Sequence, residues 1–582
     1  MIKTLAGYVK EYKKASILTP IFMILEVVAE TLIPLLMASI INEGIEAGNL
    51  QHVYTTGIWM VLVAVFGLIT GMLGGKFGAE ASTGFAKNLR QGMFEKIQTY
   101  SFANIDKFST ASLVTRLTTD VTNIQNAYQM LLRMCMRAPA SLICAMTAAF
   151  LVNAKIASIY LIAVILLGIC LFFIIRSATK YFQMVFPKYD DLNASVQENV
   201  GAIRVVKAYV REDEETTRFQ RASANIYKLF VRAEKNVSYN NPLMMLTVYS
   251  CILLISWIGA KMIVRGNMPV GDLSSLLAYC MNILMNLMML SMIFVMMSMS
   301  AASAKRVAEV LNEEPSLKNP ENPVMEVANG DVEFRKAAFA YKEGGEPVLE
   351  NINLNIHAGE TIGIIGGTGS SKTSLVNLIS RLYDVTEGQV LVGDRDVREY
   401  DTEVLRKQVA VVLQKNVLFS GSILENLRWG DPNATEEECR RACRLACADE
   451  FIERMPAKYE THIEQGGSNV SGGQKQRLCI ARALLAKPKV LILDDSTSAV
   501  DTATDAKIRK AFAEEIPDTT KIIIAQRISS VEHADRVIVL ENGRINGFDT
   551  PENLMKNNEI YREVYESQTK GGGDFDENGG EL

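Results

Sequence analysis

One stretch, residues 366–373, has the composition of a loop that binds phosphate groups. It follows an apolar run, 361–365, that is typical of a strand, and it leads into a helical segment. Backbone N–H groups and a helix N-terminus can surround phosphate oxygens. Lys372 would then reach the β- and γ-phosphates, and the Thr373 hydroxyl would bind Mg²⁺. The loop consists of Gly366, Gly367, Thr368, Gly369, Ser370, Ser371, Lys372 and Thr373, with Ser371 where glycine is usual.

A second acidic element follows the apolar run 490–493, which is again typical of a strand. Asp494 and Asp495 come directly after it. A strand that delivers a carboxylate to a phosphate-bound Mg²⁺, through water, is the usual companion of such a loop. An acidic turn after a strand is common by itself. The separation along the chain between this turn and the phosphate loop favours the metal role for Asp494.

A third motif, residues 470–474, reads Val-Ser-Gly-Gly-Gln and precedes a helix. A serine and two glycines at a helix N-terminus can approach phosphate closely. The motif resembles the signature sequence of ABC transporters, and it is the most specific motif in the chain. The resemblance assigns Ser471, Gly472, Gly473 and Gln474 to the ATP of a second chain, because each ATP in this family lies between one chain's phosphate loop and the other's signature.

Further residues match the family in order along the chain. Tyr341 corresponds to the aromatic residue that stacks on adenine, and Ser374 extends the ATP-binding loop. Gln414 corresponds to a glutamine that meets Mg²⁺ and the membrane domain. Ser498 and Asp501 match the D-loop. The resemblance extends from the N-terminus to about residue 567, and it implies an exporter half with ATP and Mg²⁺ as cofactors.

Two positions depart from the family. The residue after Asp494 is normally a glutamate that polarises the attacking water, but here it is Asp495. Gln526 replaces the switch histidine, and an amide cannot become cationic. Together these catalytic positions predict a site that binds ATP and hydrolyses it slowly. The intact signature then favours a different partner subunit, as in the heterodimeric ABC multidrug exporters of bacteria, which the chain resembles.

The first half of the chain is rich in apolar runs. A bilayer core about 30 Å thick needs roughly 20 apolar residues in a helix. Six candidate spans satisfy this, and the connections between them at 79–136 and 176–240 are long and helix-prone, so span helices should continue beyond the membrane. We expect 108–120 and 197–211 near the two turns. The spans lie near 16–42, 53–78, 137–153, 156–175, 243–264 and 273–300.

Basic residues indicate the orientation. The short connections carry few, whereas the two long connections carry many, among them Arg90, Arg116, Arg204 and Lys207. Both termini and the ATP-binding domain are therefore predicted to be cytoplasmic, in a multi-pass protein of the cytoplasmic membrane. The first 14 residues form a basic amphipathic segment rather than a signal peptide, and we expect this segment on the membrane surface.

The predicted fold is an all-α membrane domain fused to an α/β P-loop ATPase domain with the helical subdomain that the family implies. We place the membrane domain at 1–312, a linker at 313–328 and the ATPase domain at 329–567. Strand-like and helical runs alternate in the last of these, which is typical of a parallel sheet. Residues 568–582 are Gly-rich and acidic, and we expect them to be disordered.

Two sets of residues inside the spans are substrate candidates. Glu26 and Glu30 are one turn apart in the first span, and ionisable groups at membrane depth often mark function. Protonation or hydrogen bonds to a neighbouring helix are an equal alternative. A methionine stripe in the last span would suit a promiscuous apolar surface, although ordinary packing explains methionine as well. The stripe comprises Met281, Met285, Met288, Met292 and Met296, with Met299 continuing it.

Composition excludes some functions. Net charge is −5, and no basic patch interleaved with aromatics indicates nucleic acid. Cys439, Cys443 and Cys447 are one turn apart, so a thiolate metal site is conceivable, but Ala-rich surroundings favour packing.

The leading function is ATP-driven export of amphipathic, hydrophobic or cationic small molecules. An ATP-gated channel or regulator, a lipid flippase and an importer on the same scaffold are the alternatives.

Overall fold

The structure is a computed structural model that describes residues 1–342, 344–496 and 500–570. The chain divides into two compact units. The first comprises Met1–Thr99 and Phe108–Glu313, and the second comprises Tyr100–Lys107 and Glu314–Leu582. The predicted combination of a helical membrane domain with an α/β ATPase domain is confirmed.

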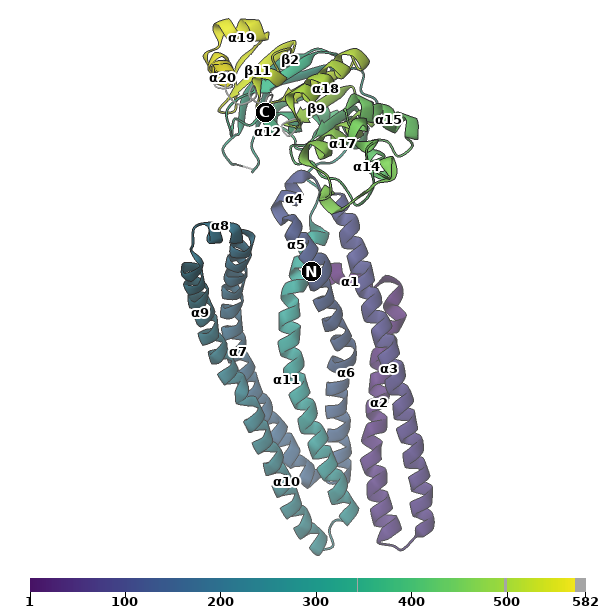
Figure 1. Cartoon of the computed structure of the whole chain (residues 1–582). Helices are drawn as coiled ribbons and strands as arrows, with labels where there is room; N and C mark the ends of the chain where they lie inside the picture. The colour runs from purple at the N-terminus through teal and green to yellow at the C-terminus, as the bar shows by residue number, and fades with distance from the viewer. Residues whose placement is uncertain (343, 497–499, 571–582) are drawn as a thin grey trace. The chain divides into compact units, whose positions relative to one another are not determined.

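The first unit consists of helices and short connections, with no strand among its described residues (Figure 1). Six helical stretches there are long and apolar enough to cross a membrane. The helices are α1 (Ile2–Ala6), η1 (Gly7–Tyr12), α2 (Lys13–Ser39), η2 (Ile40–Ile45), α3 (Leu50–Gln98), α5 (Thr110–Thr115), η3 (Arg116–Asp120), α6 (Val121–Val152), α7 (Ala154–Gly201), α8 (Ile203–Ala208), α9 (Glu212–Ser238), α10 (Asn240–Val264) and α11 (Val270–Asn312).

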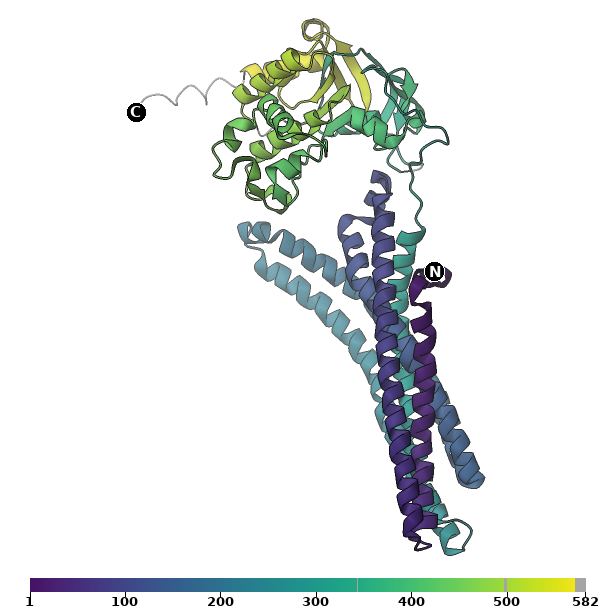
Figure 2. The same ribbon diagram turned by 90° about the vertical axis from the view of Figure 1, so that its right-hand side faces the viewer.

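These helices extend far beyond a bilayer, as predicted. α3 has 49 residues. At a rise of about 1.5 Å per residue it is on the order of 70 Å long, more than twice the roughly 30 Å of a hydrocarbon core. α7 and α9 run side by side to the short α8, which lies inside the predicted turn 197–211 (Figures 1 and 2). The other turn follows Gln98 and precedes Thr110, so residues 108–120 mostly begin the next helix.

The third and fourth spans form a tight hairpin. α6 ends at Val152 and α7 begins at Ala154, which leaves only Asn153 between them. The Asn153 side chain accepts hydrogen bonds from the N–H groups of Lys155 and Ile156 and so caps α7. An asparagine at a helix N-cap satisfies donors that the helix itself leaves free, which allows this abrupt start.

The described strands of the second unit form two large sheets and a small antiparallel pair of β7 and β8. A six-stranded sheet has the order β12-β11-β3-β10-β9-β6, with all neighbours parallel except β11 and β12. An antiparallel sheet has the order β2-β1-β4-β5. The strands are β1 (Val332–Phe339), β2 (Leu349–Ile356), β3 (Thr361–Ile365), β4 (Glu387–Val392), β5 (Arg395–Asp396), β6 (Val409–Val412), β7 (Gly421–Ser422), β8 (His462–Ile463), β9 (Val490–Asp494), β10 (Thr520–Ile524), β11 (Arg536–Glu541) and β12 (Arg544–Asp549).

Helices surround these sheets, and α4 (Phe102–Phe108) joins this unit through residues 100–107. α14 to α17 form the helical region between β6 and β9. The remaining helices are α12 (Lys372–Ile379), η4 (Val397–Glu399), α13 (Thr402–Gln408), α14 (Ile423–Leu427), α15 (Glu436–Leu445), α16 (Asp449–Ile452), η5 (Lys458–Glu460), η6 (Gln465–Gly467), α17 (Gly472–Leu485), α18 (Thr502–Glu515), η7 (Ile528–Ser530), α19 (Pro551–Asn557) and α20 (Glu559–Lys570).

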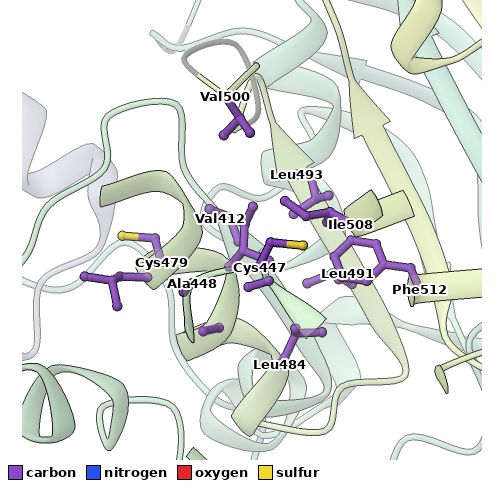
Figure 3. Packing of buried hydrophobic residues seen from close by; sticks show 14 of the residues in the cluster. Val412, Cys447, Ala448, Cys479, Leu484, Leu491, Leu493, Val500, Ile508 and Phe512 are labelled. Atoms are coloured by element: carbon purple, nitrogen blue, oxygen red, sulfur yellow. The ribbon is translucent and has the colours of Figure 1, made fainter. Parts of the chain in front are cut away.

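The cysteines of α15 and the residues after it belong to the apolar core of this unit. Cys439, Cys443 and Cys447 are buried, and Figure 3 shows Cys447 packed among Val412, Leu491 and other apolar side chains. Burial raises the pKa of the Cys443 thiol to about 12, so the thiolate that a metal needs is disfavoured. Among the described residues, no group of three or more His, Cys, Asp or Glu side chains could hold a metal ion. The packing alternative therefore accounts for this cysteine series.

Candidate functional site

The strand register brings the predicted nucleotide residues to one edge of the sheet. β10 pairs in parallel with β3 and β9, with Ile524 opposite both Ile364 and Asp494. The residues that follow these strands therefore emerge together, because the carboxyl ends of parallel strands share one edge. The register partners Ile364, Asp494 and Ile524 mark this edge. Each is followed within two residues by a predicted site residue: Gly366, Asp495 and Gln526.

The phosphate loop connects β3 to α12 in a tight backbone path. A Cβ at Gly366 would lie 2.2 Å from the Leu540 carbonyl oxygen, whereas one at Gly367 or Gly369 would meet nothing within 4 Å. The loop is thus packed against β11 on one side and open on the other. Ser371 precedes the helix with φ 70° and ψ 26°, a left-handed conformation that glycine adopts more easily. Serine takes the backbone position that a glycine would hold.

Lys372 spans this loop. Its Nζ donates to the carbonyl oxygens of Gly366 at 2.8 Å and Gly367 at 2.9 Å. Burial lowers the pKa of the Lys372 amine, while the carboxylates of Asp494 and Asp495 oppose that shift. The amine therefore lies on the loop and within the field of both acids, where it could neutralise phosphate oxygens.

Thr373 and Asp494 provide the oxygen atoms that a Mg²⁺ ion prefers. The Thr373 hydroxyl donates to Asp494 Oδ2 at 3.0 Å. Asp494 is 3% exposed, and this burial raises its pKa against the effect of the Thr373 hydrogen bond. A hydroxyl and a buried carboxylate in contact beside the phosphate loop fit an ATP-bound Mg²⁺, which would offset the charge of the phosphates.

Asp495 is held by two amides. Gln526 Nε2 donates to Asp495 Oδ2 at 2.7 Å, and the Gln414 side chain also hydrogen-bonds this carboxylate. Burial raises the pKa of Asp495, and both hydrogen bonds oppose that shift. The backbone of Asp495 has φ 49°. The two positions that depart from the family are therefore in direct contact, together with the predicted Gln414.

The predicted adenine contact, Tyr341, lies beside the start of α12. Its hydroxyl is 2.8 Å from Ser374 Oγ, and its ring is 47% exposed. Tyr383 meets the Tyr341 ring edge-on, with centroids 5.3 Å apart, and its hydroxyl donates to Asp106 of α4 at 2.6 Å. Burial raises the pKa of Tyr383, so this phenol keeps its proton. Tyr383 was not among the residues predicted from the sequence.

The signature residues form the start of α17. Ser471 is its N-cap: the Ser471 Oγ accepts from Gln474 N at 3.3 Å, and the Gln474 side chain accepts from Ser471 N at 2.9 Å. Ser471 and Gly472 are exposed. This reciprocal cap fixes the helix start and leaves its face open. Among the described residues, no hydrogen bond joins these residues to the chain's own phosphate loop.

Of the two predicted D-loop residues, the structure describes Asp501 and not Ser498. Asp501 is the N-cap of α18 and accepts from Thr504 N at 2.9 Å. That hydrogen bond lowers the pKa of Asp501. Ser498 lies outside the described residues, and so does the side chain of Met292.

Glu26 and Glu30 share one basic partner in the membrane unit. Arg137 of α6 lies 3.4 Å from Glu26 Oε1 and 2.9 Å from Glu30 Oε2. Glu26 Oε2 is buried without a hydrogen-bond partner among the described residues. The hydrogen bond from Arg137 to Glu30 is of the kind that one alternative from the sequence described, a bond to a neighbouring helix, although Arg137 itself was not named. Two carboxylates facing one guanidinium leave one formal negative charge.

The methionines of α11 share an exposed face in this single chain. Met281, Met285, Met288 and Met296 have exposed fractions between 37% and 59%. On another face of the helix, Asn282 and Asn286 form hydrogen bonds with Ser141 of α6. Polar side chains therefore join α11 to α6, and the methionine face is left open.

A membrane unit of long helices fused to a nucleotide-binding sheet defines a transporter half driven by ATP. Comparison with protein families agrees with this class. Residues 16–288 match the family described as "ABC transporter transmembrane region", and residues 349–498 match the family described as "ABC transporter". The uncharacterised ABC transporter ATP-binding protein YfiB of Bacillus subtilis is 36% identical over 97% of this chain and 98% of its own length. The chain belongs to the ABC transporter family, in its exporter-type branch.

Other relatives have more specific descriptions. An ATP-dependent lipid A-core flippase of Desulfotalea psychrophila is 32% identical over 83% of this chain and 84% of its own. The structure of a bacterial Atm1-family ABC exporter with ATP bound has a TM-score of 0.80, with 23% identity over 95% of this chain and 98% of that one. At this identity the second match establishes the fold alone. The fold and family indicate an ATP-hydrolysing, multi-pass membrane transporter.

Proposed function

We propose that this chain is one subunit of a heterodimeric exporter, and that its own nucleotide site binds Mg²⁺-ATP but hydrolyses it slowly. The observation that carries the proposal is the contact between Asp495 and Gln526. Asp495 is one methylene shorter than the usual glutamate, and an ångström of misplacement can cost about 100-fold in rate. Gln526 donates its amide to this carboxylate and takes one of the acceptor positions that water could use.

The start of α17 supports the other half of the proposal. Ser471 and Gly472 are exposed at a capped helix N-terminus, which favours an anion. We infer that this surface completes the ATP site of a different subunit, whose glutamate and histidine activate water. Phosphate contacts from Lys372, metal ligation by Thr373, Asp494 and Gln414, and stacking on Tyr341 belong to the same proposal. Both termini and the ATPase domain then lie in the cytoplasm.

The substrate we propose is an amphipathic small molecule, cationic or hydrophobic. The methionine face of α11 offers an adaptable apolar surface. The Glu26–Arg137–Glu30 cluster adds one formal negative charge at membrane depth. Lipid flipping is the second candidate, since the relative described as a lipid A-core flippase aligns over most of the chain.

Steady-state ATP hydrolysis by the purified single chain tests the proposal. We expect little activity without the second subunit and a large increase when both are assembled. The Lys372→Ala variant of the single chain gives the background rate. If the single chain hydrolysed ATP as fast as the complex, the heterodimer proposal would be wrong. Movement of a dye and of a labelled lipid into vesicles then separates export from flipping.

A further inference from the structure

Residues 526–528, which follow β10, form hydrogen bonds with the end of the last described helix as well as with Asp495. Gln568 lies in α20, two residues before the helix ends at Lys570. Its Oε1 accepts from Ile528 N at 2.8 Å, and its Nε2 donates to the Gln526 carbonyl oxygen at 2.9 Å. One planar amide therefore bonds the backbone on both sides of Arg527. Only an amide side chain offers a donor and an acceptor in this arrangement.

α20 is itself fixed against the domain core. Tyr561 is 1% exposed, and Val564 and Tyr565 pack on the core at the next turn. The N-terminal end is held too, because Asn558 Oδ1 accepts from Tyr561 N at 2.9 Å. Gln568 thus belongs to an anchored helix, although we predicted from the sequence that the disordered tail begins there.

The switch segment depends on this contact for its position. The Gln526 side chain donates a hydrogen bond to Asp495, and the Gln526 carbonyl oxygen accepts one from Gln568. Ile528 is 3% exposed and begins η7, and its N–H donates a hydrogen bond to Gln568. The backbone of Gln526 is therefore held by the C-terminal helix while its side chain meets the nucleotide site.

We propose that Gln568 is a positioning residue for Gln526, so that the C-terminal helix controls how the nucleotide site engages ATP. The inference rests on the proposed role of Gln526 at that site. Within the described part of the chain, the Gln568 side chain forms its hydrogen bonds with this segment and not with the predicted ATP-binding residues. Loss of its amide would free the backbone at Gln526 and weaken the hold of that side chain on Asp495 and on a γ-phosphate.

The test uses the full-length chain and Mg²⁺-ATP. Gln568→Leu removes both hydrogen bonds, and Gln568→Glu keeps an acceptor for Ile528 N while losing the donor. Ser567→Ala is the matched control, because Ser567 is exposed on the same turn and its Oγ donates only to Val564 O within the helix. We expect amide hydrogen exchange at Ile528 to be about 5-fold faster in Gln568→Leu, as for the loss of one hydrogen bond, and unchanged in the control.

A double-mutant cycle separates positioning from simple helix docking. We expect Gln568→Leu to weaken Mg²⁺-ATP binding about 5-fold in the wild-type background, with a smaller effect for Gln568→Glu, and to have no effect once Gln526 is alanine. Equal weakening in both backgrounds would overturn the inference and leave Gln568 as a structural contact. Unchanged binding in Gln568→Leu, with Gln526→Ala still weakened, would also overturn it. If Gln526→Ala itself bound ATP normally, the proposed role of Gln526 would fail, and the inference with it.

Discussion

Gln526 donates its side-chain amide to the Asp495 carboxylate at 2.7 Å, across the ends of the neighbouring strands β10 and β9. The two residues that replace the family's glutamate and histidine are therefore partners rather than independent changes. The amide takes one of the acceptor positions of this carboxylate and leaves fewer of them to orient water. Reversal of both changes should restore more activity than reversal of either alone.

The first prediction concerns this pair. The double variant Asp495→Glu with Gln526→His should raise hydrolysis at this chain's site by roughly 10- to 100-fold, because the carboxylate regains its reach. Asp495→Glu alone should give a modest rise, since Gln526 still occupies the carboxylate. ATPase assays on the assembled transporter, with Lys372→Ala added to each variant as the background, provide the measurement. No gain in the double variant would show that another feature limits this site.

The second prediction concerns backbone strain in the phosphate loop. Ser371 has φ 70°, a conformation that costs a non-glycine residue about 1 kcal/mol. Ser371→Gly should therefore raise the thermal stability of the ATPase unit slightly, or leave it unchanged where the added chain entropy offsets the relief. Ser371→Val should lower the free energy of unfolding by more than about 1 kcal/mol. A β-branched side chain is disfavoured most strongly in the left-handed backbone conformation.

Ser468 supplies the matched control. It has φ −64°, so Ser468→Gly relieves no strain and should destabilise the chain by a few tenths of a kcal/mol to about 1 kcal/mol. Differential scanning fluorimetry compares the variants. If Ser371→Gly and Ser468→Gly lowered the melting temperature equally, strain at Ser371 would be excluded.

The third prediction concerns two glycine sockets in α3. A Cβ at Gly84 would lie 2.3 Å from Tyr12 Cζ, and one at Gly92 would lie 2.2 Å from Tyr8 Cε1. Asn88, between them, donates to the Tyr8 carbonyl oxygen at 3.1 Å. Gly84→Ala and Gly92→Ala should each displace a ring and loosen the N-terminal segment. Hydrogen exchange in residues 7–12 should then be faster.

Gly75 provides the control for the sockets, because it lies in the same helix and its Cβ would meet nothing within 4 Å. Gly75→Ala should leave exchange in residues 7–12 unchanged. Replacement of Tyr12 by a smaller residue should make Gly84→Ala harmless. If Gly75→Ala and Gly84→Ala had the same effect, helix propensity rather than the socket would be responsible.

The fourth prediction concerns Arg137, which lies between Glu26 and Glu30. Arg137→Gln should impair assembly, at a cost on the order of 1 to 3 kcal/mol, because two carboxylates one turn apart lose their counter-ion. Glu26→Gln leaves the Glu30–Arg137 pair and should assemble normally. It should reduce transport of cationic dyes more than of neutral ones, as measured by uptake into vesicles.

Replacement of both glutamates alone is a poor test, since it leaves Arg137 without a partner. The neutral triple variant, with glutamine at all three positions, isolates the charge of the cluster. It should assemble and lose selectivity for cations. Equal loss of cationic and neutral transport in Glu26→Gln would favour a packing role for the cluster.

The arrangement of the candidate nucleotide site was largely predictable because its geometry is local. The phosphate loop, Asp494 and the start of α17 each follow a short motif between a strand and a helix. The membrane cluster was only half predictable: Glu26 and Glu30 are neighbours in sequence, but Arg137 meets them through helix packing. Gln568 was missed because it is close to Gln526 only in the folded chain, and a Gly-rich tail after it obscured the end of α20.

The central claim is that the two nucleotide sites divide their work, with this chain's signature serving the competent one. ATP turnover by the assembled transporter, with subunit stoichiometry checked for each variant, tests it most directly. Replacement of Ser471 by a bulky residue (Ser471→Phe) should nearly abolish turnover, whereas Asp495→Ala should reduce it little. The opposite pattern, with Asp495→Ala inactive and Ser471→Phe near wild type, would place the catalytic work on this chain's own phosphate loop and contradict the account.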